Sequence, residues 1–106
     1  MGRTAAILLA ATMIPSMAHA SDYSKLSGDE LASFVKQDCG SCHGMTLKGG
    51  LGRPLTTDRL SGFDVETLKD VVLNGVPGTA MPPWAGILTP DQAEWIARNL
   101  KEGTLQ

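Results

Sequence analysis

Three segments of the chain carry apolar residues at the spacing of an amphipathic helix, with polar residues between them. The first is expected to begin at Ser27, which forms the pattern of a capping box with Glu30, and to end at about Cys39. The second is expected to begin near Asp64, a favourable N-cap residue, and to stop at Gly75. Each segment therefore has one face suited to a buried core.

The third segment carries the strongest helix signals of the chain. Thr89 suits the N-cap, Pro90 the first helical position and Gln92 the third, which together predict a second capping box, while Gly103 predicts the end of the helix. Small alanines on its apolar face predict close contact with another helix, expected to be the first. No segment alternates apolar and polar residues as a strand does, so the predicted fold class is all-α.

Glycine and proline dominate the two connections between these helices. Residues 44–62 show neither a helical nor a strand period, and their glycines predict a loop. Residues 76–84, called the strap below, contain three of the six prolines of the chain. Each proline fixes its own φ and excludes regular helix. The strap is therefore expected to be stiff.

Residues 1–20 have the order of a cleaved secretory signal peptide. Arg3 precedes an apolar run from Ala5 to Ile14, and an A-x-A cleavage pattern ends at Ala20. Export would place residues 21–106 in the periplasm if the chain is bacterial. The apolar run is shorter than the about 20 residues that a membrane-spanning helix needs, although an uncleaved N-terminal anchor remains an alternative.

Removal of residues 1–20 would leave one domain of 86 residues, 21–106. Loss of Arg3 changes the formal net charge from −2 to −3. No basic patch indicates binding of nucleic acid, and no second apolar stretch indicates a membrane span. A core of this size is marginally stable by itself, so a large apolar group at its centre would supply much of the packing.

The segment Cys39-Gly40-Ser41-Cys42-His43 matches C-x-x-C-H, the attachment signature of c-type haem. Two thiols at this spacing can add to the two vinyl groups of the porphyrin, and the adjacent imidazole can become an axial ligand of iron. The alternatives for the thiols, a redox pair or half of a zinc site, require a βαβ setting or further Cys and His residues. The motif therefore predicts one covalent haem c.

Few residues of the exported chain could supply a second axial ligand. After cleavage the chain would keep one histidine, His43, and two methionines, Met45 and Met81. Met45 follows His43 by two residues and stays on the same side of the macrocycle, whereas Met81 can reach the opposite face. Met81 on the stiff strap is therefore the expected sixth ligand, and packing in the core is its alternative role.

The order of these features resembles a small class I cytochrome c, with three main helices around one haem. The resemblance rests on the capped first helix, C-x-x-C-H, the glycine-rich loop, the strap sequence Met-Pro-Pro-Trp and the amphipathic C-terminal helix. More narrowly, residues 39–52 and 78–84 are similar to the NirC-type, or cytochrome c55X-like, monohaem cytochromes associated with periplasmic haem nitrite reductase. This resemblance implies His43 and Met81 as the axial ligands.

One departure from the family pattern concerns the partner of the histidine ring. A ligating histidine usually donates its other ring N–H to a carbonyl or carboxylate, and backbone around Arg53 and Pro54 is the expected acceptor. The neighbouring glycines are expected to let backbone pass close against the haem face on the His43 side. Cytochromes of this family commonly have Gly-Pro-x-Leu where this chain has Gly52-Arg53-Pro54-Leu55, which leaves open the carbonyl that accepts the proton.

The resemblance implies a periplasmic electron carrier in denitrification, with nitrite reductase or its haem-maturation proteins as partners, rather than an enzyme. An alternative is a role in maturation of the special haem of the reductase, by supply of electrons or by binding of a haem intermediate. A gas-binding sensor or catalyst is a third alternative, and it would need Met81 to leave the iron.

Overall fold

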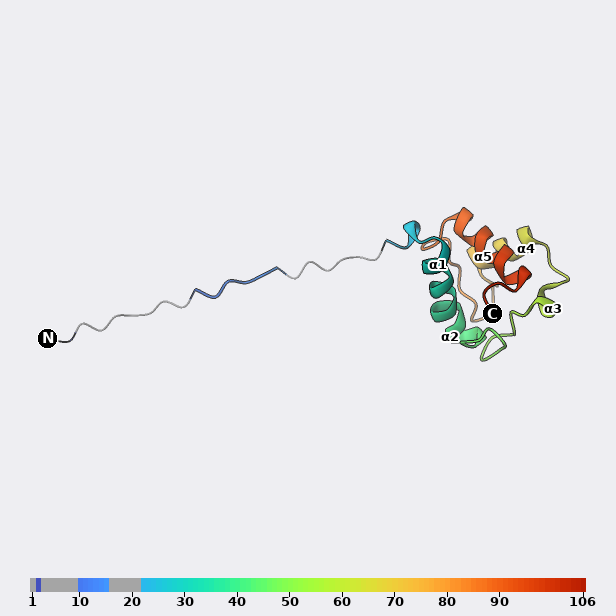
Figure 1. Cartoon of the computed structure of the whole chain (residues 1–106), viewed down its shortest axis with the longest axis horizontal. Coiled ribbons are helices and arrows are strands. Elements are labelled where there is room, and N and C mark those ends of the chain that lie inside the picture. Colours follow the sequence, from blue (N-terminus) through green and yellow to red (C-terminus); the bar gives the residue numbers. More distant parts are fainter. Residues whose placement is uncertain (1, 3–9, 16–21) are drawn as a thin grey trace.

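The computed structural model describes residues 2, 10–15 and 22–106, and its helices lie in the last of these ranges (Figure 1). They are η1 (Tyr23–Lys25), α1 (Gly28–Phe34), the π-helix η2 (Val35–Cys39), α2 (Gly40–His43), α3 (Thr57–Leu60), α4 (Val65–Asn74) and α5 (Pro90–Glu102). No strand occurs in the described residues, which confirms the all-α class. None of the helices in this part of the chain is long and apolar enough to cross a membrane. Most of the expected signal peptide, residues 1–20, lies outside the described residues.

Helices α1, η2 and α2 follow one another without a break from Gly28 to His43. The prediction that this helix ends at about Cys39 is therefore wrong. Cys39 and Gly40 both keep right-handed helical backbone, with φ of −67° and −63°. The helix ends only at Gly44, because no earlier residue of the motif breaks it. As a consequence, the whole C-x-x-C-H motif is presented by a single helical stretch.

The predicted helix N-caps differ in outcome. Thr89 Oγ1 accepts a hydrogen bond from the Gln92 N–H at 3.2 Å, and Gln92 Oε1 accepts one from the Thr89 N–H at 2.9 Å, which confirms the second capping box. Asp64 caps α4 as expected. The capping box predicted at Ser27 is wrong, because its side chain makes no capping hydrogen bond. Gly28 takes a φ of +52°, which turns the backbone out of capping geometry.

These caps predict unequal losses of stability. Thr89→Ala is expected to lower the free energy of unfolding by about 1 kcal/mol, because it leaves the Gln92 N–H without its partner. Ser27→Ala is expected to change it by less than about 0.5 kcal/mol, since no hydrogen bond is lost. Denaturant unfolding of the two haem-loaded variants measures the difference, and equal losses would contradict this assignment of the caps.

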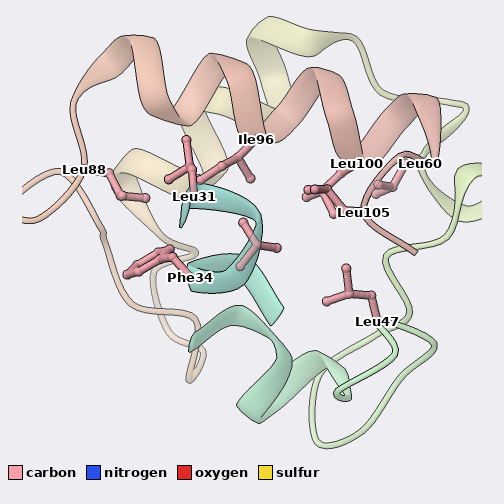
Figure 2. Packing of buried hydrophobic residues seen from close by; sticks show 9 residues of the cluster. Leu31, Phe34, Leu47, Leu60, Leu88, Ile96, Leu100 and Leu105 are labelled. Atoms are coloured by element: carbon pink, nitrogen blue, oxygen red, sulfur yellow. The ribbon is translucent and has the colours of Figure 1, made fainter. Parts of the chain in front are cut away.

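Helix α5 runs along the core and packs against α4, α1 and α3 (Figures 1 and 2). Ala93 and Ala97 on this helix are fully buried, as expected for close helix contact, and the largest contact of α5 is with α4 rather than with α1. One cluster of buried apolar residues joins these helices: Leu31, Phe34, Val35, Leu47, Leu60, Leu88, Ile96, Leu100 and Leu105. The core therefore connects the helix that carries C-x-x-C-H with the C-terminal residues.

Two short helices, η1 and α3, lie in segments that the apolar pattern does not identify as helical. A helix of three or four residues shows no period to detect, so tertiary contacts decide it. The side-chain amide of the buried Gln92 donates to the carbonyls of Tyr23 and Leu26, at 2.8 and 2.9 Å, and so connects η1 to α5. Leu60 of α3 lies beside Leu100 and Leu105 in the core (Figure 2).

Candidate haem-binding site

The two cysteines occupy one face of the helical stretch, because they are three positions apart. Cys39 is half-buried against the core cluster, and Cys42 is exposed. Burial, with a smaller effect from the neighbouring Asp38 carboxylate, raises the pKa of the Cys39 thiol to about 11. The thiol is therefore neutral at neutral pH, and its apolar surroundings suit a thioether sulfur, which carries no proton.

His43 is the last residue of the motif, and the structure shows which carbonyl accepts the proton of its ring. Its Nδ1 lies 2.7 Å from the carbonyl oxygen of Arg53. A carbonyl can only accept, so Nδ1 carries the proton and donates it. Nε2 of the neutral ring is then the nitrogen with a free lone pair, as a metal ligand requires. Pro54 follows the accepting residue and favours an extended backbone at Arg53.

The glycine-rich loop folds back onto the end of this helix. The Gly49 N–H donates to the carbonyl of His43 at 2.8 Å, and the Gly52 N–H donates to the carbonyl of Cys42 at 2.7 Å. Gly52 comes so close that a Cβ there would lie 2.9 Å from Nδ1 of His43. The loop backbone therefore passes close on the His43 side, as predicted, and its approach to the haem face stays a prediction.

Because Gly52 lies so close to the His43 ring, a methyl group added at Gly52 is expected to clash with that ring. Gly52→Ala is expected to lower the free energy of unfolding of the haem-loaded protein by about 1–3 kcal/mol, because either the imidazole or the loop must move. Gly62→Ala is the matched control, since a Cβ there meets nothing within 4 Å. Its unfolding curve should match that of the unchanged protein to about 0.5 kcal/mol. Equal unfolding curves for the two variants would show that the approach to the ring has no energetic effect.

Met81 lies on the strap, which is hydrogen-bonded within itself at this residue. The Val76 N–H donates to the Met81 carbonyl at 3.2 Å, and the Met81 N–H donates to Thr79 Oγ1 at 3.3 Å. Met81 is half-buried, whereas Met45 is 63% exposed. The sequence identifies Gly75 only as a helix stop, yet a Cβ there would lie 2.6 Å from the Met81 carbonyl oxygen. The backbone of Met81 is therefore held against the end of α4.

Trp84 anchors the other end of the strap to two helices. Its backbone N–H donates to the Val72 carbonyl of α4 at 3.0 Å. Its ring meets that of Phe34 in α1 edge to face, with centroids 5.5 Å apart. Trp84 therefore packs against an aromatic side chain of α1. The strap thus connects α4 with the helix that leads into C-x-x-C-H.

The residues of this site fit haem c. Two thiols on one helical face, an imidazole with a free Nε2 and a thioether on a braced strap are the donors that a c-type haem uses. Helix α4 has no buried residue, and Leu68, Val71 and Val72 are half-buried, so it presents apolar surface that a porphyrin can cover. Among the residues that the structure describes, no three His, Cys, Asp or Glu side chains are grouped to hold a metal ion.

The fold and this donor set define a class I c-type cytochrome, and comparison with known proteins agrees. Residues 26–99 match the sequence profile of the family described as cytochrome C oxidase, cbb3-type, subunit III. The chain is 62% identical to cytochrome c55X of Paracoccus denitrificans over 69 residues. This alignment covers 65% of this chain and 67% of that protein. The chain belongs to this cytochrome c family, within its NirC-like, c55X group, and its cofactor is haem c.

Two solved structures have a fold similar to that of this chain. The c-type cytochrome NirC is 49% identical, with a TM-score of 0.71 over 73% of this chain and 91% of that one. The structure titled dihydro-heme d1 dehydrogenase NirN in complex with DHE is 32% identical, with a TM-score of 0.61, over 65% of this chain and 15% of that one. These alignments confirm the class I fold. The chain spans about two thirds of the length of its cytochrome c55X relatives.

Proposed function

We propose that this protein carries single electrons through one covalent haem c whose iron is ligated by His43 and Met81. Cys39 and Cys42 hold the macrocycle as thioethers. The hydrogen bond from His43 Nδ1 to the Arg53 carbonyl is the observation that carries this proposal, because it leaves the lone pair of Nε2 free for a metal and makes the ring more basic. The bound haem supplies a one-electron couple between ferrous and ferric iron.

If protein side chains fill both axial positions of the iron, the protein is suited to electron transfer and not to catalysis. A thioether favours the ferrous state, so His/Met ligation raises the reduction potential relative to two nitrogen ligands. With both positions filled, no place is left at the metal for a substrate. The role of the strap is to keep Met81 in place. The hydrogen bonds of the Met81 backbone with Thr79 and Val76 support this role.

Carbon monoxide tests this arrangement directly. The reduced protein is expected to show no spectral change on addition of carbon monoxide, because Met81 occupies the position that the gas would take. Optical spectra of the purified haem-loaded protein, with and without the gas, give the answer. Ready binding would contradict the carrier and favour the sensor or catalyst with an open iron site.

We also propose that residues 1–20 are removed during export and that residues 21–106 act in the periplasm. The charge, apolar run and A-x-A pattern support this. Mass spectrometry of the haem-loaded protein from a periplasmic fraction should give a chain that begins at Ser21. A haem-loaded chain that retains residues 1–20 and remains with the membrane would contradict the proposal and support an anchor.

The proposed partner is the periplasmic haem nitrite reductase, to which the protein would donate electrons. This proposal rests on the resemblance to NirC-type cytochromes and on the small, exposed residues 78–80 beside Met81, which allow close approach. Electron-transfer contacts are transient and bury less than about 1,200 Å². The formal charge of −3 expected for residues 21–106 favours a positively charged face on the partner.

A second candidate function is a role in maturation of the special haem of the reductase. It is supported by the structural similarity to the dihydro-heme d1 dehydrogenase NirN, which was solved in complex with DHE. Affinity capture with the haem-loaded protein distinguishes the two roles. Stable binding only to the haem-maturation proteins would favour this candidate, whereas transient reduction of the purified nitrite reductase would favour electron donation.

A further inference from the structure

The last residues of the chain lie against the loop segment that carries the Arg53 carbonyl. Gln106 Nε2 donates a hydrogen bond to the Leu55 carbonyl at 2.8 Å. Leu105 is only 4% exposed and lies beside Leu100 and Leu60 in the core (Figure 2). The C-terminal turn after α5 is therefore packed by Leu105 and hydrogen-bonded by Gln106. Its contact is with a segment that lies 51 positions earlier in the sequence.

The same loop segment is also held by Leu47. The Leu55 N–H donates to the Leu47 carbonyl at 2.8 Å, and the Leu47 N–H donates to the Gly44 carbonyl at 2.8 Å. Leu47 is fully buried and has a φ of +60°, the only positive φ of a non-glycine residue in the described part of the chain. Such a conformation persists only where surrounding contacts enforce it. Both polar backbone groups of Leu55 are thus used to fix this segment.

Leu55 is connected to the hydrogen bond of the histidine through a short, stiff piece of chain. Only Pro54 separates it from Arg53, and the pyrrolidine ring removes one of the two free rotations at that residue. The Arg53 carbonyl, 2.7 Å from Nδ1 of His43, is therefore coupled to the position of Leu55. A displacement of Leu55 is expected to lengthen or bend this hydrogen bond.

We infer that Gln106 and Leu105 are positioning residues for the axial histidine, which they affect through Leu55 and the Arg53 carbonyl. The inference rests on the proposed ligation of iron by His43. A firm hydrogen bond at Nδ1 makes the ring a stronger donor and favours ferric iron. The C-terminal residues thereby lower the reduction potential, although they lie outside the motif, the loop and the strap.

The amide of Gln106 provides the first test. Gln106→Ala removes the donor to Leu55, so the reduction potential should rise, and the Nδ1 proton of His43 should exchange with solvent about five- to tenfold faster. Voltammetry measures the first quantity and NMR of the reduced, haem-loaded protein the second. Thr104→Ala is the matched control, because the Thr104 hydroxyl bonds to Asn99 of α5 and, among the described residues, not to the loop. Both quantities should stay unchanged.

Two core leucines separate positioning from general loss of stability. Leu105→Ala and Leu31→Ala both remove a buried leucine, and both should lower the denaturant midpoint. Only Leu105→Ala should raise the potential and speed the exchange of the ring proton, because Leu31 lies at the opposite side of the cluster (Figure 2). Unchanged potential and exchange in Gln106→Ala and Leu105→Ala would overturn the inference, as would equal shifts in the two controls. The proposed function is judged separately, from carbon monoxide binding by the unchanged protein.

Discussion

Met81→Ala is expected to abolish the weak far-red charge-transfer band of the ferric protein and to let the reduced protein bind carbon monoxide. Both changes follow from removal of the thioether, which leaves one axial position open to water or gas. The reduction potential should fall, because the ligand that favours ferrous iron is lost. Optical spectra of oxidised and reduced haem-loaded protein, followed by voltammetry, measure these effects.

Met45→Ala provides the control for this experiment. It removes the other methionine of residues 22–106, which is 63% exposed and lies two positions after His43. Its Sδ lies against Gly40, where a Cβ would be 3.5 Å away. The far-red band and the resistance to carbon monoxide should survive this substitution. A band that persists in Met81→Ala and disappears in Met45→Ala would reverse the ligand assignment.

Gly75→Ala is expected to lower the free energy of unfolding by about 3 kcal/mol, because the new methyl group adds backbone strain to a steric clash. Gly75 has a φ of 66° and a ψ of −170°, a region that is almost exclusive to glycine. A Cβ there would also lie 2.6 Å from the Met81 carbonyl oxygen and 2.8 Å from the Pro83 nitrogen. Because the strap must move, the far-red band should weaken as well.

Gly78, which lies within the strap, isolates the steric contribution. Gly78 also has a positive φ, of 78°, but a Cβ there meets nothing within 4 Å. Gly78→Ala should therefore lose about 1–2 kcal/mol from backbone strain alone and keep its spectrum. Denaturant unfolding and ferric spectra of the two variants measure both quantities. Equal losses and equal spectra would mean that the contact between Gly75 and the strap does not hold Met81.

The parts of this fold that depend on near neighbours could be read from the sequence. The Thr89, Pro90 and Gln92 pattern predicts the start of α5, and Gly75 and Gly103 predict the ends of α4 and α5, because caps involve residues three or four positions apart. C-x-x-C-H is likewise a local signal. The failure at Ser27 has a local cause too, since the φ of +52° at Gly28 is not visible in the capping pattern.

The sequence by itself determined the all-α class, the haem c motif, and the choice of Arg53 and its neighbours as partners of His43. Only the tertiary structure decided that the Arg53 carbonyl is the acceptor, that Trp84 connects the strap to α1, and that Gln106 reaches Leu55. The physical reason is the distance along the chain. Caps and motifs are set by interactions within a few residues, whereas these contacts form only when the core brings remote segments together, and no local pattern records which atoms then meet.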